Sequence, residues 1–255
     1  MRLCIFCSRS ANSVEDAWPL WITSQFRGTR PSEIHAERGG VSLRPWSLHQ
    51  PELKIRCVCQ SCNNGWMSQL ERRAQTFLQP LLTGESCAVD MEAQATIATW
   101  ALKTAMVLEA MGPMEKRAYS QLDRERLRLR AAIPWRTSIW LAVSTDPAWF
   151  MSSKTRLGGE VEGHSGASIT MAFAHAALQV LTIKVPEQVG PNTKVTTDVR
   201  RGPWEQLTVR LWPTQETPIN WPPPMGLNGE SGLDALADRF STSNQNRDEV
   251  DTLAV

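Results

Sequence analysis

Two pairs of cysteines, each with two residues between its members, constrain this chain more than any other feature. Cys4 and Cys7 form the first pair, and Cys59 and Cys62 form the second. This spacing lets two thiolates converge on one metal ion while the backbone between them turns. Two such pairs supply the four ligands of a tetrahedral site that favours zinc, with an iron–sulfur cluster as the weaker alternative. Because protein sulfurs would fill every position, we expect a structural zinc ion.

The chain has two further cysteines, Cys57 and Cys87. In "CVCQSC", Cys57 could replace Cys59 as a ligand, but only Cys59 leaves two residues before Cys62. Cys87 stands alone, which favours a place in the core. Residues 8–58 separate the two pairs, a longer interval than in a small zinc ribbon, so the sequence predicts an insertion between them.

Composition limits the class of protein. The chain has 255 residues, of which 42% are hydrophobic and 21% are charged, as in soluble globular proteins. It contains neither a run of 18 apolar residues nor a signal peptide, so we expect a cytoplasmic protein with reduced cysteines and no membrane partner. The net charge is +1, although the last 28 residues are acidic. A mildly basic body is compatible with a polyanionic partner.

Hydrophobic periodicity predicts an α+β protein. Period 3.6 favours three helices, and period two favours strands further along the chain. The segments 168–174 and 178–185 are too close together for a crossover helix, so we expect an antiparallel sheet. Three regions follow, namely 1–85, a helical-then-sheet region 86–217, and an extended, largely mobile acidic tail 218–255 that includes a short helix near Leu233–Phe240. The expected helices are 66–81, 91–111 and 121–132, and the expected strands are 138–143, 168–174, 178–185, 194–199 and 206–212.

The segments "CIFC", "NSVEDAWPLW" and "CVCQSCNNGWMSQLE" together resemble the treble-clef, HNH-type endonucleases of bacteria and phages. The resemblance covers residues 4–78, and "TWALKTAMVLEAM" (99–111) is similar to a helix that follows in one subset of that family. It implies an N-terminal treble-clef or ββα zinc finger, with the zinc held by the two cysteine pairs. It also implies a second metal ion, Mg²⁺ or Mn²⁺, and hydrolysis of DNA phosphodiester bonds.

The resemblance also implies which residues form that site. Glu15 matches the acid that precedes the family's histidine, Pro19 matches a nearby proline, and Asn63 matches the asparagine after the last cysteine. Asp16 stands where the family has the general-base histidine. An ordinary aspartate, with a pKa of about 3.9, is a poor base near neutral pH but a good ligand for a hard cation. We therefore expect Glu15, Asp16 and Asn63 at a site that is either altered or inactive.

Two questions stay open at this point. His35 and His49, inside the insertion, are candidates for a displaced base. Arginines of the insertion and of the third helix (Arg124, Arg126, Arg128 and Arg130) are candidates for phosphate contacts. The alternative function is a non-catalytic, zinc-stapled module of phage or mobile-element origin that binds nucleic acid or a protein.

Overall fold

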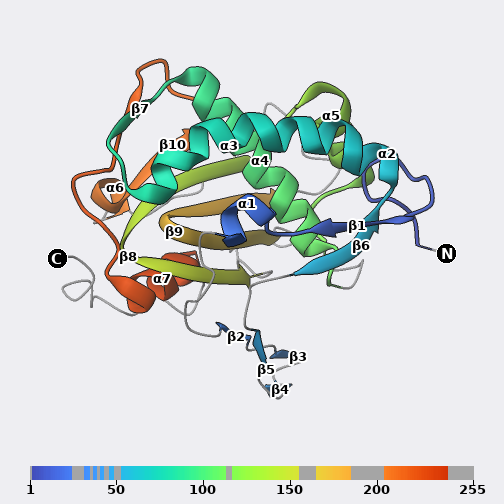
Figure 1. Cartoon of the computed structure of the whole chain (residues 1–255), viewed down its shortest axis with the longest axis horizontal. Coiled ribbons are helices and arrows are strands. Elements are labelled where there is room, and N and C mark those ends of the chain that lie inside the picture. Colours follow the sequence, from blue (N-terminus) through green and yellow to red (C-terminus); the bar gives the residue numbers. More distant parts are fainter. Residues whose placement is uncertain are drawn as a thin grey trace.

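The computed structural model (Figure 1) combines helices with antiparallel sheets, which confirms the expected mixed architecture. It describes residues 2–24, 32–34, 37–38, 41–42, 46–48, 53–112, 117–154, 165–184 and 204–240. Among these, the residues within 25–52 and 148–165 and residue 184 are described by their backbone alone. The expected strand 194–199 lies outside these residues. Within the insertion, strand β2 (Ser32–Ile34) pairs with β5 (Trp46–Leu48), and β3 (Glu37–Arg38) pairs with β4 (Val41–Ser42).

A two-stranded ribbon and a helix follow the first cysteine pair. Strand β1 (Ser13–Asp16) pairs antiparallel with β6 (Lys54–Val58), which leads directly into the second cysteine pair. Helix α2 (Gln60–Cys62), the π-helical turn η2 (Asn63–Met67) and helix α3 (Ser68–Thr83) then run on as one rod with a kink at Gly65. A short helix, α1 (Leu20–Thr23), follows β1.

Capping residues set the ends of the helices. Asp90 accepts a hydrogen bond from the backbone N–H of Ala93 and begins α4 (Met91–Glu109). Ser120 and Asp123 form the expected capping box at the start of α5 (Gln121–Arg130). Helix α3 runs past Pro80 and ends at Gly84, whose φ of 73° suits glycine. The three predicted helices are therefore present, with ends shifted by a few residues.

The main sheet has the order β10-β8-β9 and is antiparallel. Its strands are β8 (Thr137–Lys154), β9 (Ser165–Lys184) and β10 (Thr208–Trp212), which follows the short helix α6 (Trp204–Leu207). The prediction of separate strands at 168–174 and 178–185 was wrong, because both belong to β9. The residues between them include no glycine or proline that would favour a turn. Instead, Ala174 takes a φ of 50° opposite a register shift in β8, so the strand bends without reversing.

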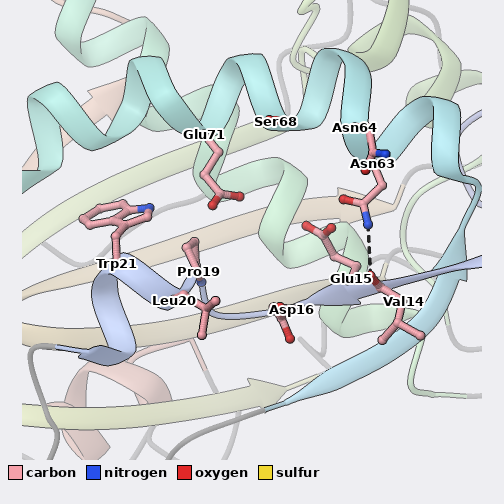
Figure 2. Close-up of a pocket in the computed structure, with 10 residues that line it drawn as sticks. All are labelled: Val14, Glu15, Asp16, Pro19, Leu20, Trp21, Asn63, Asn64, Ser68 and Glu71. Atoms are coloured by element: carbon pink, nitrogen blue, oxygen red, sulfur yellow. Dashed lines mark hydrogen bonds between the residues drawn. The ribbon is translucent and has the colours of Figure 1, made fainter.

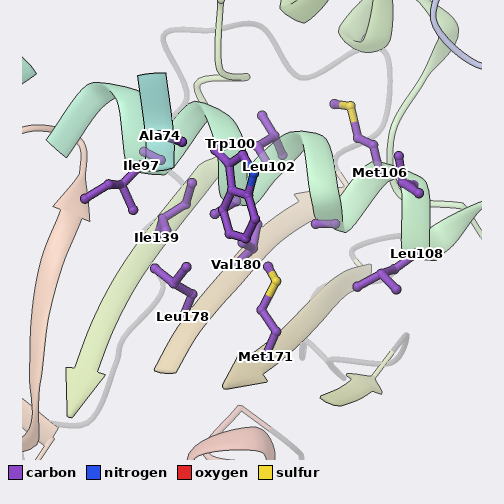
Figure 3. Packing of buried hydrophobic residues seen from close by; sticks show 14 of the residues in the cluster. Ala74, Ile97, Trp100, Leu102, Met106, Leu108, Ile139, Met171, Leu178 and Val180 are labelled. Carbon is purple, nitrogen blue, oxygen red and sulfur yellow. The ribbon is translucent and has the colours of Figure 1, made fainter. Parts of the chain in front are cut away.

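Helices cover both faces of this sheet, and side chains alternate between them. On one face, Ile97 and Trp100 of α4 pack over Ile139, Met171 and Val180 (Figure 3). On the other face, helix α7 (Gly229–Asp238) packs its leucines against small residues of β8 and β9. The segment expected to be an extended tail contains two packed elements. Strand β11 (Ile219–Trp221) pairs with β7 (Cys87–Val89), and helix α7 follows it.

One apolar core joins the cysteine-rich part to the sheet. The ring of Trp18, just after β1, lies edge-on to Phe173 of β9 with ring centroids 5.0 Å apart. Phe173 in turn lies 5.9 Å from Trp100 of α4. This line of aromatic contacts fixes β1 and the residues after it against the sheet.

Candidate functional site

The four cysteines selected by their spacing lie together. The sulfur atoms of Cys4, Cys7, Cys59 and Cys62 are all within 4.8 Å of one another, and those of Cys7 and Cys59 are 3.5 Å apart. Sulfurs bonded at 2.3 Å to one tetrahedral zinc ion are about 3.8 Å apart. The cluster could therefore hold a metal ion such as zinc. In the described part of the chain, no other three His, Cys, Asp or Glu residues form such a group.

Cys57 lies outside the cluster. Burial, reinforced by the charge of Glu15, raises the pKa of the Cys57 thiol to about 12, so it stays protonated. Burial also raises the pKa of Cys7, but hydrogen bonds from the side chain and backbone of Arg9 and from neighbouring thiols outweigh it and lower that pKa to about 6. A thiolate is therefore available at Cys7, whereas Cys57 behaves as a buried apolar residue.

Local contacts hold the two cysteine pairs in register. The backbone N–H of Ile5 donates to the carbonyl of Cys57, which ties the first pair to β6. The rings of Phe6 and Trp66 meet edge-to-face with centroids 4.9 Å apart, so the rod formed by α2, η2 and α3, called the finger helix from here on, packs on the first pair. Arg128 of α5 donates through Nε to the carbonyl of Phe6 at 3.1 Å. These three contacts hold the first cysteine pair against β6, the finger helix and α5.

A pocket of about 420 Å³ opens beside this cluster, between β1, the residues that follow it, and the finger helix (Figure 2). The three site residues expected by resemblance all line it, although Asn63 is far from Glu15 and Asp16 in the sequence. Pro19, Leu20 and Trp21 form an apolar wall. The full lining consists of Val14, Glu15, Asp16, Pro19, Leu20, Trp21, Asn63, Asn64, Ser68 and Glu71.

Two of the expected residues are engaged by the protein itself. The Glu15 carboxylate, buried in the core, pairs through Oε1 with Nζ of Lys103 at 3.1 Å. The side-chain nitrogen of Asn63 donates to Ser13 Oγ and to the carbonyl of Val14, both at 2.9 Å. Asn63 therefore ties the start of the finger helix to β1, directly at the pocket and two residues before the kink at Gly65.

Sequence reasoning missed two residues of this site. Glu71, on α3, faces the pocket from the side opposite β1 (Figure 2). Burial raises its pKa, Lys103 lowers it, and the charges of Glu15 and Asp16 raise it further. Lys103 is the second, and its signal was present in the sequence: it is the single charge between Ala93 and Leu108, the largely apolar middle of a long helix. Glu71 gave no comparable signal, since an acid on an amphipathic helix is ordinarily solvent-exposed.

No histidine replaces the missing base among the described pocket residues. His35, His49 and His164 lie outside the residues whose side chains the structure describes. His175 lies on β9, where its Nδ1 is 2.9 Å from the carbonyl oxygen of Ser144. Within the described pocket, the groups that can accept a proton are carboxylates.

The arginines of the third helix divide into two kinds. Arg124 is buried, pairs with Glu109 and donates to the carbonyl of Met106, so it is a structural residue. Arg126 and Arg130 are exposed, and so is Arg56 on β6. The arginines at 27, 30 and 44 lie outside the described residues, and Arg38 is described by its backbone alone. The candidates for phosphate contacts in the described part are the exposed cations.

Comparisons of the chain with protein-family models, with curated proteins and with solved structures find no match. In the described part of the chain, no helix is both long and apolar enough to cross a membrane.

Proposed function

We propose that this chain is an HNH-like zinc protein whose acidic pocket hydrolyses DNA phosphodiester bonds with the help of Mg²⁺ or Mn²⁺. One observation carries the proposal. Glu15, Asp16 and Asn63, which the resemblance selects from separate parts of the sequence, line a single pocket beside the four-cysteine cluster. The antiparallel β1–β6 ribbon followed by the finger helix also supports the ββα arrangement that the resemblance implies.

The zinc ion has a purely structural part in this proposal. The four thiolates would fill its coordination sphere, so it would not activate water. Its role would be to fix the ends of β1 and the finger helix, the two elements that carry the pocket acids. Because Cys-x2-Cys pairs with four sulfur ligands select zinc over hard cations, the second metal ion would bind in the acidic pocket.

The pocket suits a hydrated divalent ion rather than a closed cage. Mg²⁺ keeps several waters and binds through one or two carboxylates. The second oxygen of Glu15 would hold it, since Lys103 occupies only Oε1 of Glu15, whereas the Asp16 carboxylate points away from the finger helix (Figure 2). Such an ion neutralises charge that develops on the phosphate oxygens and the leaving group.

The chain's own acids would handle the proton. Glu71 is the pocket acid best suited to accept it, because burial raises its pKa above the ordinary value of a glutamate and makes it a stronger base. It would take a proton from the attacking water as the new oxygen–phosphorus bond forms. The phosphorus–oxygen bond to the leaving strand would break, and that oxygen would take its proton from solvent.

Cleavage of supercoiled plasmid by the purified protein, with Mg²⁺ or Mn²⁺, tests the proposal. Glu15→Ala should abolish cleavage, whereas Glu216→Ala, which changes an exposed acid in the loop after β10, should cleave like the wild type. Asp16→His should raise the rate near neutral pH, because it supplies a base of suitable pKa. A wild-type protein that cleaves, and a Glu15→Ala variant that cleaves equally well, would remove the pocket from the reaction.

A non-catalytic, zinc-stapled binding module is the second candidate. The observation that favours it is the internal use of the pocket groups: Lys103 pairs with Glu15, and Asn63 donates to β1. Absence of cleavage by the wild type, with activity appearing in Asp16→His, would indicate a decayed nuclease. Absence of cleavage by every variant, with one zinc per chain and retained DNA binding, would favour the binding module.

A further inference from the structure

Lys103 is the most unusual charged residue in the described part of the chain. It lies in the middle of α4, where every neighbour from Ala93 to Leu108 is apolar or a small polar residue apart from Gln94, and its side chain is 0% exposed. Lysine is almost never fully buried unless it is paired. Its Nζ also lies 5.9 Å from the centre of the Trp100 ring, on the side of the helix that faces the core.

The partner of Lys103 is Glu15, a pocket residue far from it in the sequence. Nζ donates to Oε1 of Glu15 at 3.1 Å, across 88 positions in the sequence. The Glu15 carboxylate points from β1 towards the finger helix and Asn63 (Figure 2). Lys103 thus pairs with a buried carboxylate that also belongs to the lining of the pocket.

Stability alone does not account for this pair. A buried ion pair is typically no more stabilising than two apolar residues of the same volume, because desolvation offsets the attraction. Apart from threonines, the residues of α4 on either side of Lys103 are apolar, so an apolar side chain would fit this stretch of the helix. The charge of Lys103 also acts on Glu71, the acid on the far wall of the pocket. The charge of Lys103 therefore acts on two of the three pocket acids, Glu15 and Glu71.

We propose that Lys103 is a positioning residue of the pocket: it holds Glu15 through Oε1 so that the second carboxylate oxygen faces the bound ion and substrate. This inference rests on the proposed function, since it assigns a residue to that reaction. Lys103 touches neither substrate nor metal in this scheme and acts through Glu15. Residues of this kind, which hold a ligand in place, typically change metal affinity or activity by about 10- to 100-fold when they are replaced.

A double-mutant cycle on the full-length zinc-loaded protein tests the inference. Its members are the wild type, Lys103→Met, Glu15→Gln and the double variant, with Arg73→Met, an exposed cation on α3, as the control. Plasmid cleavage with Mn²⁺ gives kcat and KM, and calorimetric titration with Mn²⁺ gives the affinity for the ion without any turnover. Circular dichroism fixes a temperature at which each variant is folded.

The expected result is non-additive. Lys103→Met should lower kcat by about 10- to 100-fold with little change in KM. The double variant should be no slower than Glu15→Gln, because Lys103 acts through the group already removed. The Mn²⁺ affinity should follow the same pattern, and Arg73→Met should match the wild type in both measurements.

Other results would overturn the inference and are distinguishable from failure of the proposed function. If folded Lys103→Met keeps wild-type kcat and Mn²⁺ affinity, Lys103 merely fills the core, while the nuclease proposal stands. If the losses of kcat caused by Lys103→Met and by Glu15→Gln multiply in the double variant, that result would also contradict the inference. If the wild type neither cleaves nor binds Mn²⁺, the proposed function itself fails and takes this role with it. If Lys103→Met does not fold, the inference still requires the kcat of Glu15→Gln and that of the double variant to agree within about threefold.

Discussion

The cysteine cluster and the sheet core sit in one molecule but are held together by different forces. Around the cluster, short segments meet through a few backbone hydrogen bonds, four convergent thiols and a few side chains of the shared core, such as Phe6, Val58 and Met67. Between α4 and the sheet, large apolar side chains are fully buried, and this packing does not depend on a metal ion. The pocket lies where the two regions meet, and the Lys103–Glu15 pair crosses from one to the other. The comparison predicts that each region fails in its own way.

Loss of the metal should have the largest effect, and it should be confined to the first region. Structural zinc contributes about 10 kcal/mol or more to the folding of small zinc domains. Cys59→Ser should therefore bind no stoichiometric zinc and lose amide-exchange protection in residues 2–16 and 54–67, while β8 and β9 stay protected. Elemental analysis and hydrogen exchange measure this.

Cys57→Ser is the matched control for that experiment, because Cys57 is equally buried but lies outside the cluster. It should keep one zinc per chain. If instead Cys57→Ser loses the zinc and Cys59→Ser retains it, the ligand set is wrong.

The second region should fail through its packing. Trp100 is fully buried between α4 and the sheet, so Trp100→Ala should lower the free energy of unfolding by about 4 kcal/mol. Trp135→Ala, at a site 45% exposed, should have little effect. Urea denaturation gives both values, and the zinc content of folded Trp100→Ala should be unchanged. A variant that loses zinc in proportion to its stability would show that the two regions are one cooperative unit.

The sequence was informative about the two regions to different degrees. The spacing of Cys4, Cys7, Cys59 and Cys62 selected the four residues that converge, because knuckle geometry depends on local backbone alone. Helix ends followed from Asp90 and Ser120 for the same reason, since a cap bonds to a backbone group three residues away.

Tertiary relations were harder to predict. The unbroken strand β9 was missed because period two continues through Ala174 whether the chain turns or bends there. Lys103 and Glu71 were missed because their roles depend on β1, which lies more than 50 positions away in the sequence. The pocket itself was anticipated only through a resemblance, and periodicity would not have indicated it.

The link between the regions is tested by removing one or both of its charges. Lys103→Met leaves the Glu15 carboxylate buried without its partner, which should cost about 3 kcal/mol of stability. Lys103→Met combined with Glu15→Leu should recover most of that loss, because no unpaired charge remains. Urea denaturation at neutral pH measures both. A double variant that is less stable than Lys103→Met would mean that the pair stabilises the contact between the regions directly.

The smallest effect should come from Glu71, and its sign depends on pH. Burial raises the pKa of Glu71 above its ordinary value, so the folded protein binds its proton more tightly than the unfolded chain does. The stability this provides is present at pH values below the unfolded pKa and is lost as the pH rises through the folded pKa. Glu71→Gln removes that loss, so it should be more stable than the wild type at pH 8, with the difference shrinking towards pH 4. Thermal denaturation across this range measures the difference, with Glu92→Gln, a change at an exposed acid of α4, as the control. A Glu71→Gln variant that is less stable at pH 8 than the wild type would mean that ionised Glu71 is held by attractive contacts, and that the pocket is built to keep it charged.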